Sequence, residues 1–305
     1  MDNLTHSLVG VALAQSGLAR LSPGATTALI VGSNLPDIDI LFALQGAASY
    51  LEHHRDLTHS VVGAPVLALL LAGVLAAFVR GARFLGLLAA SGTAIAVHVL
   101  MDLCTSYGTR VLSPFDRTFY AWDLVFIVDP AILLVLLLTL LFARRQNLSA
   151  RLATVGLGLI VAYVGARAGL HARALDEAQS RLPGGRARHV VALPSPLDPF
   201  HWRILADTGD AYLIGDVRLD GPSPALKRRE KRPEDAVVTR AREASAIAQI
   251  FLSFSTFPWL EVEAKDGSTE VTWTDLRFQE RGRRSFEAKV VLDERGLLRS
   301  EAFRF

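Results

Sequence analysis

Histidine and aspartate side chains of the kind that bind metal ions occur in several short segments within the first 130 residues of this 305-residue chain. Imidazole and carboxylate groups suit zinc, manganese or iron, and cysteine is not required. His98 and Asp102 stand four residues apart, so one face of a helix would carry both. Asp37 and Asp39 follow Pro36, which breaks a helix and favours a turn or an extended segment. Together these spacings favour a metal site built from several segments.

The composition separates the chain into two regions that must position these residues. The mean hydropathy of +0.32 is high for a soluble protein. Residues 1–170 carry 10 arginines and 9 acidic residues, whereas residues 171–305 carry 22 basic and 21 acidic residues. The net charge of +2 gives no electrostatic footprint for nucleic acid, and the single cysteine excludes a disulfide framework. We predict a transmembrane helical domain over residues 1–172 and a soluble domain over residues 173–305.

About six apolar runs predict a helical membrane bundle in the first region. A spanning helix needs about 20 mostly apolar residues. The runs are Leu4–Ala19, Ala25–Leu44, Val61–Val79, Phe84–Leu103, Leu124–Phe142 and Leu152–Leu170. Arginines lie in the connections at residues 20, 80–83 and 144–151, which the positive-inside rule places in the cytoplasm. This orientation puts both termini, together with the histidines and aspartates, on the extracytoplasmic side.

The candidate ligands therefore gather at one end of the predicted helices. Residues 1–170 hold five of the eight histidines and no lysine. Ionisable groups near a bilayer are costly and tend to be functional. Structural alternatives remain open, namely an interfacial His6, a capping turn at Asp37 and Asp39, solvated His53 and His54, a loop pair of Asp116 with Arg117, and a helix start at Asp129. Taken jointly, the residues favour one shared metal site.

A series of short motifs resembles one protein family in the same order along the chain. The motifs are Met-Asp-Asn-Leu-Thr-His6-Ser, Asn34-Leu-Pro-Asp37-Ile-Asp39, His54-Arg55-Asp56-Leu-Thr-His59-Ser, His98-Val-Leu-Met-Asp102, Thr105-Ser-Tyr107-Gly, Leu112-Ser-Pro-Phe115 and Trp122-Asp123 through Asp129-Pro130. Residues 1–170 resemble the predicted membrane-bound metal-dependent hydrolases typified by the inner-membrane protein YdjM. The resemblance implies a multi-pass protein of the bacterial inner membrane with a hydrolase activity distantly similar to that of zinc phospholipases C.

The resemblance also implies roles for individual residues. The metal ligands that it carries over are His6, Asp37, His59, His98 and Asp102. Asp39, His54 and Asp123 would support these ligands or bind a second ion. The expected cofactor is a divalent metal, zinc first, with manganese or iron as alternatives.

Hydrolysis would also require a base for the metal-bound water. Asp39 and Asp123 are the candidates, because each lies beside a ligand segment and the sequence offers neither an obvious structural partner. Asp56 is less suited, since the adjacent Arg55 would neutralise it.

The second region predicts a small α+β domain. Its expected strands are Arg188–Leu193, Ala211–Leu219, Leu260–Lys265, Thr269–Phe278, Phe286–Asp293 and Leu297–Phe303. Asp266-Gly267 and Arg295-Gly296 mark hairpin turns. Apolar residues at helical spacing predict one helix over Glu234–Phe254, and the charged run 227–232 is expected to be a solvated loop.

Three classes of function are compatible with this arrangement. The favoured one is a metal-dependent hydrolase that acts on a membrane lipid or lipid-linked ester or phosphoester at the extracytoplasmic face. A metal transporter is disfavoured, because the polar groups crowd one end of the helices and no polar path leads to the other end. A non-enzymatic membrane scaffold with a structural metal remains the further alternative. The sequence has no serine nucleophile elbow, Walker loop or HExxH motif.

Overall fold

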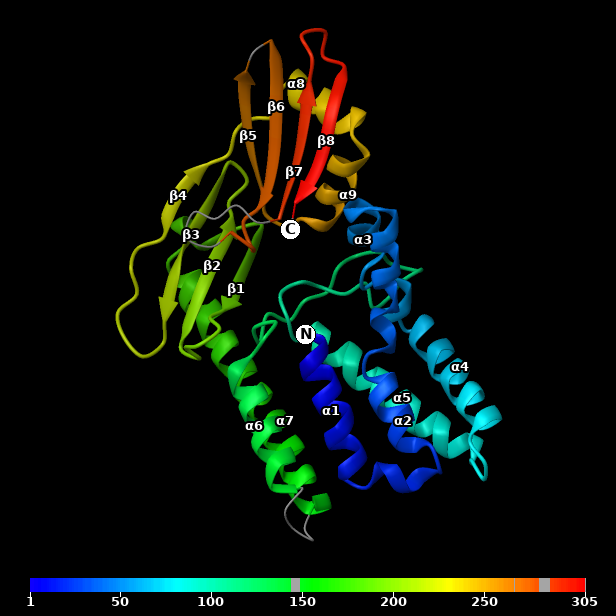
Figure 1. Ribbon diagram of the computed structural model, residues 1–305. Coiled ribbons are helices and arrows are strands. Elements are labelled where there is room, and N and C mark those ends of the chain that lie inside the picture. The colour runs from blue at the N-terminus through cyan, green and yellow to red at the C-terminus, as the bar shows by residue number, and fades with distance from the viewer. Residues whose placement is uncertain (144–148, 266, 280–285, 305) are drawn as a thin grey trace. The chain divides into compact units, whose positions relative to one another are not determined.

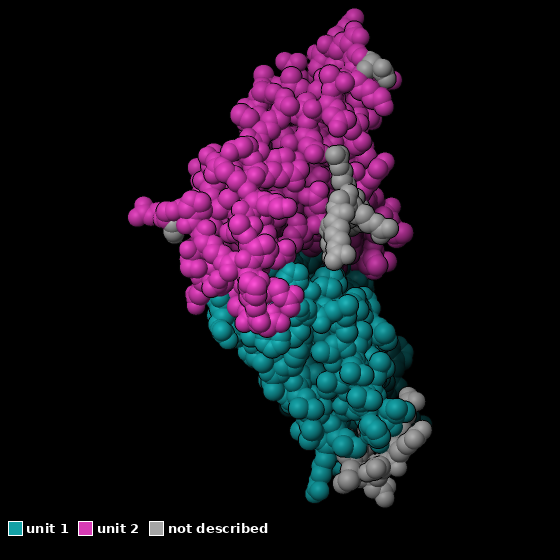
Figure 2. Space-filling model, turned by 90° about the vertical axis from the view of Figure 1, so that its left-hand side faces the viewer, with its two compact units in different colours: residues 1–39, 55–173, 194–202 teal, residues 40–54, 174–193, 203–305 magenta. Residues whose placement is uncertain are grey.

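The computed structural model describes residues 1–305 except 144–148, 266, 280–285 and 305 (Figure 1). The chain divides into two compact units. Unit 1 comprises residues 1–39, 55–173 and 194–202, and unit 2 comprises residues 40–54, 174–193 and 203–305 (Figure 2). The predicted domain boundary between residues 172 and 173 falls inside α7, a single helix that contributes to both units.

Unit 1 is built from helices that pack through small residues. Its elements are α1 (Asn3–Gln15), η1 (Leu18–Leu21), α2 (Ala25–Gly32), the first part of η2 (Leu35–Gln45), η3 (Leu57–His59), α4 (Gly63–Phe78), α5 (Phe84–Leu103), α6 (Pro130–Ala143) and most of α7 (Ser149–Ser180). Helix α5 packs against both α2 and α4, and α1 packs against α2 and α6. The core where α1, α2 and α5 meet contains fully buried alanines, which let the helix backbones approach closely: Ala12, Ala25, Ala28, Ala90 and Ala94.

The prediction of six membrane helices is not confirmed. Among the described residues, two helices are long and apolar enough to cross a membrane, namely Phe84–Leu103 and Ala150–Ser180. Two bent helix pairs, Ala25–Gly32 with Leu35–Gln45 and Ala47–His59 with Gly63–Phe78, bring the number to four if each counts as one broken span. The N-terminal region is thus a helical region with two to four candidate spans.

Helix α6 shows why one predicted span is shorter than its apolar run. The run begins at Leu124, but the helix begins at Pro130, whose ring favours the first helical position. Asp129 caps the helix with Oδ1, which accepts hydrogen bonds from the N–H groups of Ala131 and Ile132 at 3.0 and 3.2 Å. The helix start at Asp129 is therefore confirmed, and the predicted start at Leu124 is wrong.

The start of α4 fixes the short helix that carries His59. Ser60 Oγ accepts a hydrogen bond from the Gly63 N–H at 3.0 Å, so α4 begins at Gly63 rather than at Val61. A Cβ atom on Gly63 would lie 1.8 Å from the carbonyl oxygen of Leu57, the first residue of η3. Only glycine allows this close approach.

The described residues of unit 2 form two four-stranded sheets, the helices α3, α8 and α9, and the C-terminal ends of η2 and α7. Its elements are α3 (Ala47–His53), η4 (Pro183–Gly185), β1 (His189–Pro194), β2 (His201–Asp207), β3 (Ala211–Arg218), β4 (Lys227–Glu230), α8 (Ala236–Ala244), α9 (Ala246–Phe254), β5 (Pro258–Lys265), β6 (Ser268–Asp275), β7 (Glu287–Leu292) and β8 (Leu298–Arg304). The strand orders are β1-β2-β3-β4 and β5-β6-β7-β8, and the second sheet is antiparallel throughout. Helix α9 packs against β7, β8 and α3.

Each of the six predicted strands overlaps a strand of unit 2, whereas β2 was not predicted and two further predictions are corrected. The hairpins are confirmed by the pairings β5–β6 and β7–β8, and Gly267 and Gly296 have left-handed φ angles of 72° and 75°. The other half of the first predicted turn, Asp266, lies outside the described residues. The charged run expected to be a loop instead forms β4, which pairs with β3. The single predicted helix is two helices, because Ser245 is extended (φ −115°, ψ 116°) and its Oγ caps α9.

Candidate metal centre

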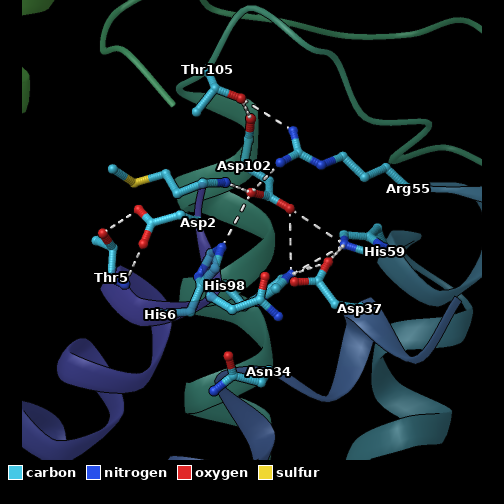
Figure 3. Close-up of polar contacts among 12 residues, drawn as sticks. Asp2, Thr5, His6, Asn34, Asp37, Arg55, His59, His98, Asp102 and Thr105 are labelled. Atoms are coloured by element: carbon cyan, nitrogen blue, oxygen red, sulfur yellow. Dashed lines mark hydrogen bonds and ion pairs between the residues drawn. The ribbon is translucent and has the colours of Figure 1, made fainter. Parts of the chain in front are cut away.

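Four side chains from three segments of unit 1 converge into one buried cluster (Figure 3). Asp37 comes from η2, His59 from η3, and His98 and Asp102 from α5. One ligand atom of each lies within 4.8 Å of those of the other three. His59, His98 and Asp102 are sealed from solvent, whereas the side chain of Asp37 is 13% exposed. We call these four residues the four-donor cage.

The separations within the four-donor cage match those around a tetrahedral ion. His59 Nε2 lies 3.1 Å from His98 Nε2, 3.4 Å from Asp37 Oδ1 and 3.3 Å from Asp102 Oδ2. His98 Nε2 lies 3.6 Å from Asp37 Oδ1 and 3.4 Å from Asp102 Oδ2. Donors at about 2.0–2.1 Å from a tetrahedral zinc ion are about 3.3–3.4 Å from one another. Asp102 Oδ2 is buried yet accepts no hydrogen bond from the described residues, so the cage fits a cation at its centre.

Both histidines of the cage are oriented by contacts to Nδ1, the ring nitrogen that faces away from the cage. His98 Nδ1 lies 2.7 Å from the carbonyl oxygen of Ser33. A carbonyl oxygen can only accept, so Nδ1 carries the proton and Nε2 presents its lone pair to the cage. His59 Nδ1 lies 3.4 Å from Asp39 Oδ2 and 3.0 Å from Thr58 Oγ1. Metal-binding histidines are usually fixed in this way, by a carboxylate or a backbone carbonyl on the outer nitrogen.

Arg55 contacts both Asp39 and Asp102 and so orients two parts of the site. The sequence analysis did not predict this role. Its backbone adopts a left-handed φ of 57°, and its N–H donates to Asp39 Oδ2 at 2.9 Å. Its guanidinium group donates from Nη2 to Asp102 Oδ1 at 2.8 Å and from Nη1 to Thr105 Oγ1 at 3.1 Å. The ring of Tyr107 lies 5.0 Å from its Cζ. A sequence signal existed, since Arg55 stands between two histidines in a region without lysine.

The expected pairing of Arg55 with its neighbour Asp56 is wrong. Asp56 Oδ2 instead accepts hydrogen bonds from Arg110 Nη1 at 3.2 Å and from Arg117 Nη2 at 3.1 Å. The alternative of a loop pair between Asp116 and Arg117 does not hold either, because Arg117 pairs with Asp56. Asp116 instead accepts from Tyr120 Oη at 2.7 Å, and this hydrogen bond lowers the pKa of Asp116 below its ordinary value.

The remaining predicted residues lie outside the four-donor cage. His6 is fully buried beside it, with Nε2 3.3 Å from Asp102 Oδ1 and its ring stacked on His98 at 3.9 Å. His54 belongs to unit 2, where it ends α3 and its ring stacks on Tyr50. Its role as a ligand stays a prediction.

Asp123 lies in the segment that follows α5. The N–H groups of its neighbours Trp122 and Leu124 donate to the carbonyl oxygens of Leu103 and Cys104, at 2.8 and 2.9 Å. Asp123 itself has a φ of 54° and is nearly buried. Burial raises the pKa of the nearby Cys104 thiol to about 11, so this thiol is protonated at neutral pH.

These features define a protein of membrane-helix composition with a buried histidine and aspartate cluster of metal-binding type. The chain belongs to the YdjM inner membrane protein family, whose model matches residues 1–174. A second family model, the YfhP C-terminal alpha/beta plait domain, matches residues 237–303. The chain is 29% identical over 321 residues to the "Uncharacterized protein YfhP" of Bacillus subtilis (strain 168), covering 98% of this chain and 94% of that protein. No solved structure shows a significant match. The predicted family membership is confirmed.

Proposed function

We propose that this protein is an integral membrane metal-dependent hydrolase that cleaves an ester or phosphoester of a lipid or lipid-linked molecule at the extracytoplasmic face. The observation that carries the proposal is the four-donor cage, whose separations of 3.1–3.6 Å suit a tetrahedral divalent ion. When bound, such an ion lowers the pKa of a coordinated water and polarises a carbonyl or phosphoryl oxygen. Two imidazole and two carboxylate donors favour zinc, with manganese or iron as alternatives.

Three residues of the cage are held rigidly, and the fourth, Asp37, lies where solvent can reach the site. Asp102 and His98 are fixed on α5, and His59 is held by Asp39 on its outer nitrogen. Asp37 is the one partly exposed member of the cage and stands on the 3-10 segment η2. Water and substrate would therefore reach the ion beside Asp37. A carboxylate that gives up its place, or a fifth ligand beside it, would provide the open position that zinc catalysis requires.

Exposed apolar side chains beside the cage support a lipid substrate. Among the aliphatic residues within three positions of a cage residue or of His6, Val9, Ile95, Val99 and Leu103 are buried, whereas six are between 46% and 59% exposed: Leu4, Ile38, Ile40, Leu57, Val61 and Leu100. Exposed apolar surface of this kind marks contact with a membrane or a partner. A substrate that is itself a membrane lipid would meet the site without leaving the apolar phase.

A structural metal in a non-enzymatic scaffold is the second candidate. The observation in its favour is that the cage supplies four protein donors, which is the number typical of closed structural zinc sites. A metal transporter would need polar groups along the helices toward the other end. Helix α4 and the apolar helix α6 offer none among their described residues, apart from Thr139.

Metal analysis and lipid hydrolysis by the same purified samples test the proposal. Wild-type protein should carry a tightly bound divalent ion and cleave a member of a panel of phospholipids and acyl-ester lipids. His98→Ala should lose both the ion and the activity. His53→Ala is the matched control, because His53 stacks on Phe42 in unit 2 and should keep both. Fully loaded wild-type protein that cleaves no lipid of the panel would favour the scaffold.

A further inference from the structure

Three arginines from two connections of unit 1 lie at one end of its helices. Arg20 lies in η1, between α1 and α2, whereas Arg80 and Arg83 lie in the turn between α4 and α5. Figure 1 shows both connections at the same end of unit 1. All three side chains are exposed. We call these three residues the arginine cluster.

Hydrogen bonds from Arg83 hold the two connections together. Its Nη2 donates to the carbonyl oxygens of Arg20 and Leu21 at 2.9 and 2.8 Å, and its backbone N–H donates to Ser22 Oγ at 2.8 Å. A Cβ atom on Gly86 would clash with the carbonyl oxygen of Leu21, so the start of α5 packs directly on η1. The fold therefore fixes Arg20 and Arg83 as neighbours.

No carboxylate neutralises the arginine cluster within the part of the chain that the structure describes. The two segments that contain the cluster, residues 3–36 and 57–101, include no aspartate or glutamate. Its guanidinium groups form no ion pair with a described residue, and the side chains of Arg20 and Arg80 form no hydrogen bond with one either. The cluster therefore carries three positive charges that are available to an external anion.

Helix α5 indicates how deep the arginine cluster lies in a bilayer. Arg83 directly precedes this helix, whose 20 residues are apolar enough to cross a membrane. At 1.5 Å per residue, α5 is about 30 Å long, which equals the thickness of the hydrocarbon core. The cage residues His98 and Asp102 lie near the other end of the helix. A bilayer that α5 crosses therefore places the phosphates of one leaflet beside the cluster.

Exposed apolar side chains flank the arginine cluster. Phe78, Phe84 and Leu85 are 84%, 44% and 77% exposed, whereas the nearby Leu87 is buried. A soluble anion makes no use of such side chains, but the acyl chains of a lipid would cover them. Three cations beside exposed apolar surface are complementary to an amphiphile with a negatively charged head.

We propose that the arginine cluster binds the phosphate group of an anionic phospholipid, whose acyl chains lie against Phe78 and Leu85. A guanidinium group donates two parallel hydrogen bonds to phosphate oxygens, and each arginine near a membrane surface strengthens the binding of anionic lipid. A zwitterionic phospholipid fits less well, because its ammonium group adds positive charge beside the arginines. The bound lipid bridges the two connections, and its binding does not depend on the proposed hydrolase activity.

Lipid binding to purified full-length protein tests the proposal. Phosphatidylglycerol and phosphatidylcholine with identical acyl chains are added to protein in a neutral detergent, and native mass spectrometry measures both dissociation constants. Wild-type protein should bind phosphatidylglycerol more tightly, and salt should weaken this binding because it screens the charges. Equal affinities for the two lipids overturn the proposal. Displacement of phosphatidylglycerol by the same concentration of glycerol 3-phosphate indicates a site for a soluble anion and overturns it as well.

Two double variants assign the lipid to the arginine cluster. Arg20→Gln/Arg80→Gln should bind phosphatidylglycerol about 30-fold more weakly, the combined effect of two arginines near a lipid surface, and should bind phosphatidylcholine as before. Since neither side chain bonds to a described residue, the melting temperature without lipid should not change. Arg117→Gln/Arg218→Gln is the control, because it removes the same charge from two exposed arginines that are each paired with an aspartate. Undiminished binding in the first variant, or an equal loss in the control, contradicts the assignment.

Discussion

Arg55 and Asp102 form a buried ion pair, with Nη2 2.8 Å from Oδ1, that leaves the other carboxylate oxygen facing the four-donor cage. The same arginine holds Asp39 through its backbone N–H, and Asp39 in turn faces the outer nitrogen of His59. One residue in a left-handed conformation therefore orients two residues of the four-donor cage, His59 and Asp102, that are 43 positions apart in the sequence. This relationship makes Arg55 a positioning residue of the site.

We expect Arg55→Lys to weaken metal binding about 10- to 100-fold, the usual effect of losing a partner that orients a ligand. A lysine ammonium group cannot donate to Asp102 and Thr105 with the planar fork of arginine. The metal dissociation constant, measured by competition with a chelating dye, checks this expectation. Arg117→Lys is the control, because Arg117 is an exposed side chain paired with Asp56 and should leave the constant unchanged. Equal metal affinity in both variants would remove Arg55 from the site.

Metal content and turnover, measured together on Asp→Asn variants, distinguish whether Asp39 and Asp123 act as a base or orient a ligand. If an aspartate acts as the base, its Asp→Asn variant should keep the metal while turnover falls about 10²–10⁴-fold. If the aspartate instead orients His59, its Asp→Asn variant should bind the metal about 10- to 100-fold more weakly. The contact of Asp39 with His59 predicts the second pattern for Asp39→Asn, and we expect the first for Asp123→Asn. Full metal and full turnover in both variants would exclude them as bases.

The residue types predicted the cage more accurately than the apolar runs predicted the helices. The run Phe84–Leu103 coincides with α5, because no proline interrupts it. The run from Leu124 does not coincide with α6, because Pro130 sets the helix start and the preceding residues pair with the end of α5. The four cage residues were all among the predicted ligands, and their 3.1–3.6 Å separations depend on side-chain positions that no spacing rule supplies. Arg55 was missed because a left-handed arginine is rare and its backbone bond to Asp39 leaves no trace in the sequence.

The arginine-bearing connections near residues 20, 80–83 and 144–151 predict that the C-terminus is extracytoplasmic. Alkaline phosphatase fused after Phe305 should therefore be active in bacterial cells, because that enzyme matures only outside the cytoplasm. A green fluorescent protein fused at the same position should be dark when exported by the same route. Bright fluorescence with an inactive phosphatase would reverse the proposed orientation.

In unit 2, Arg277→Ala should lower the free energy of unfolding by about 3–5 kcal/mol, since it leaves a buried carboxylate without its charge partner. Arg277 Nη2 lies 2.8 Å from Asp275 Oδ2, and Asp275 is fully buried. Arg218→Ala is the matched control: Arg218 and Asp220 are also two residues apart, but both are exposed, so the loss should be about 0–1 kcal/mol. Chemical denaturation followed by tryptophan fluorescence measures both. Similar losses in the two variants would contradict the assignment.

Gly63→Ala should weaken metal binding although residue 63 is not a ligand. The new Cβ would lie 1.8 Å from Leu57 O, so either α4 or η3 must move, and η3 carries His59. Overpacking of this kind costs about 1–3 kcal/mol, and a displaced His59 Nε2 would no longer lie at 3.1–3.4 Å from the other donors. Gly73→Ala, in the same helix with no atom within 4 Å of its added Cβ, should leave metal affinity unchanged and stabilise α4 by up to about 1 kcal/mol. The metal dissociation constant and the melting temperature of the two variants test this prediction. If Gly63→Ala binds metal as tightly as Gly73→Ala, the contact between α4 and η3 does not control the position of His59.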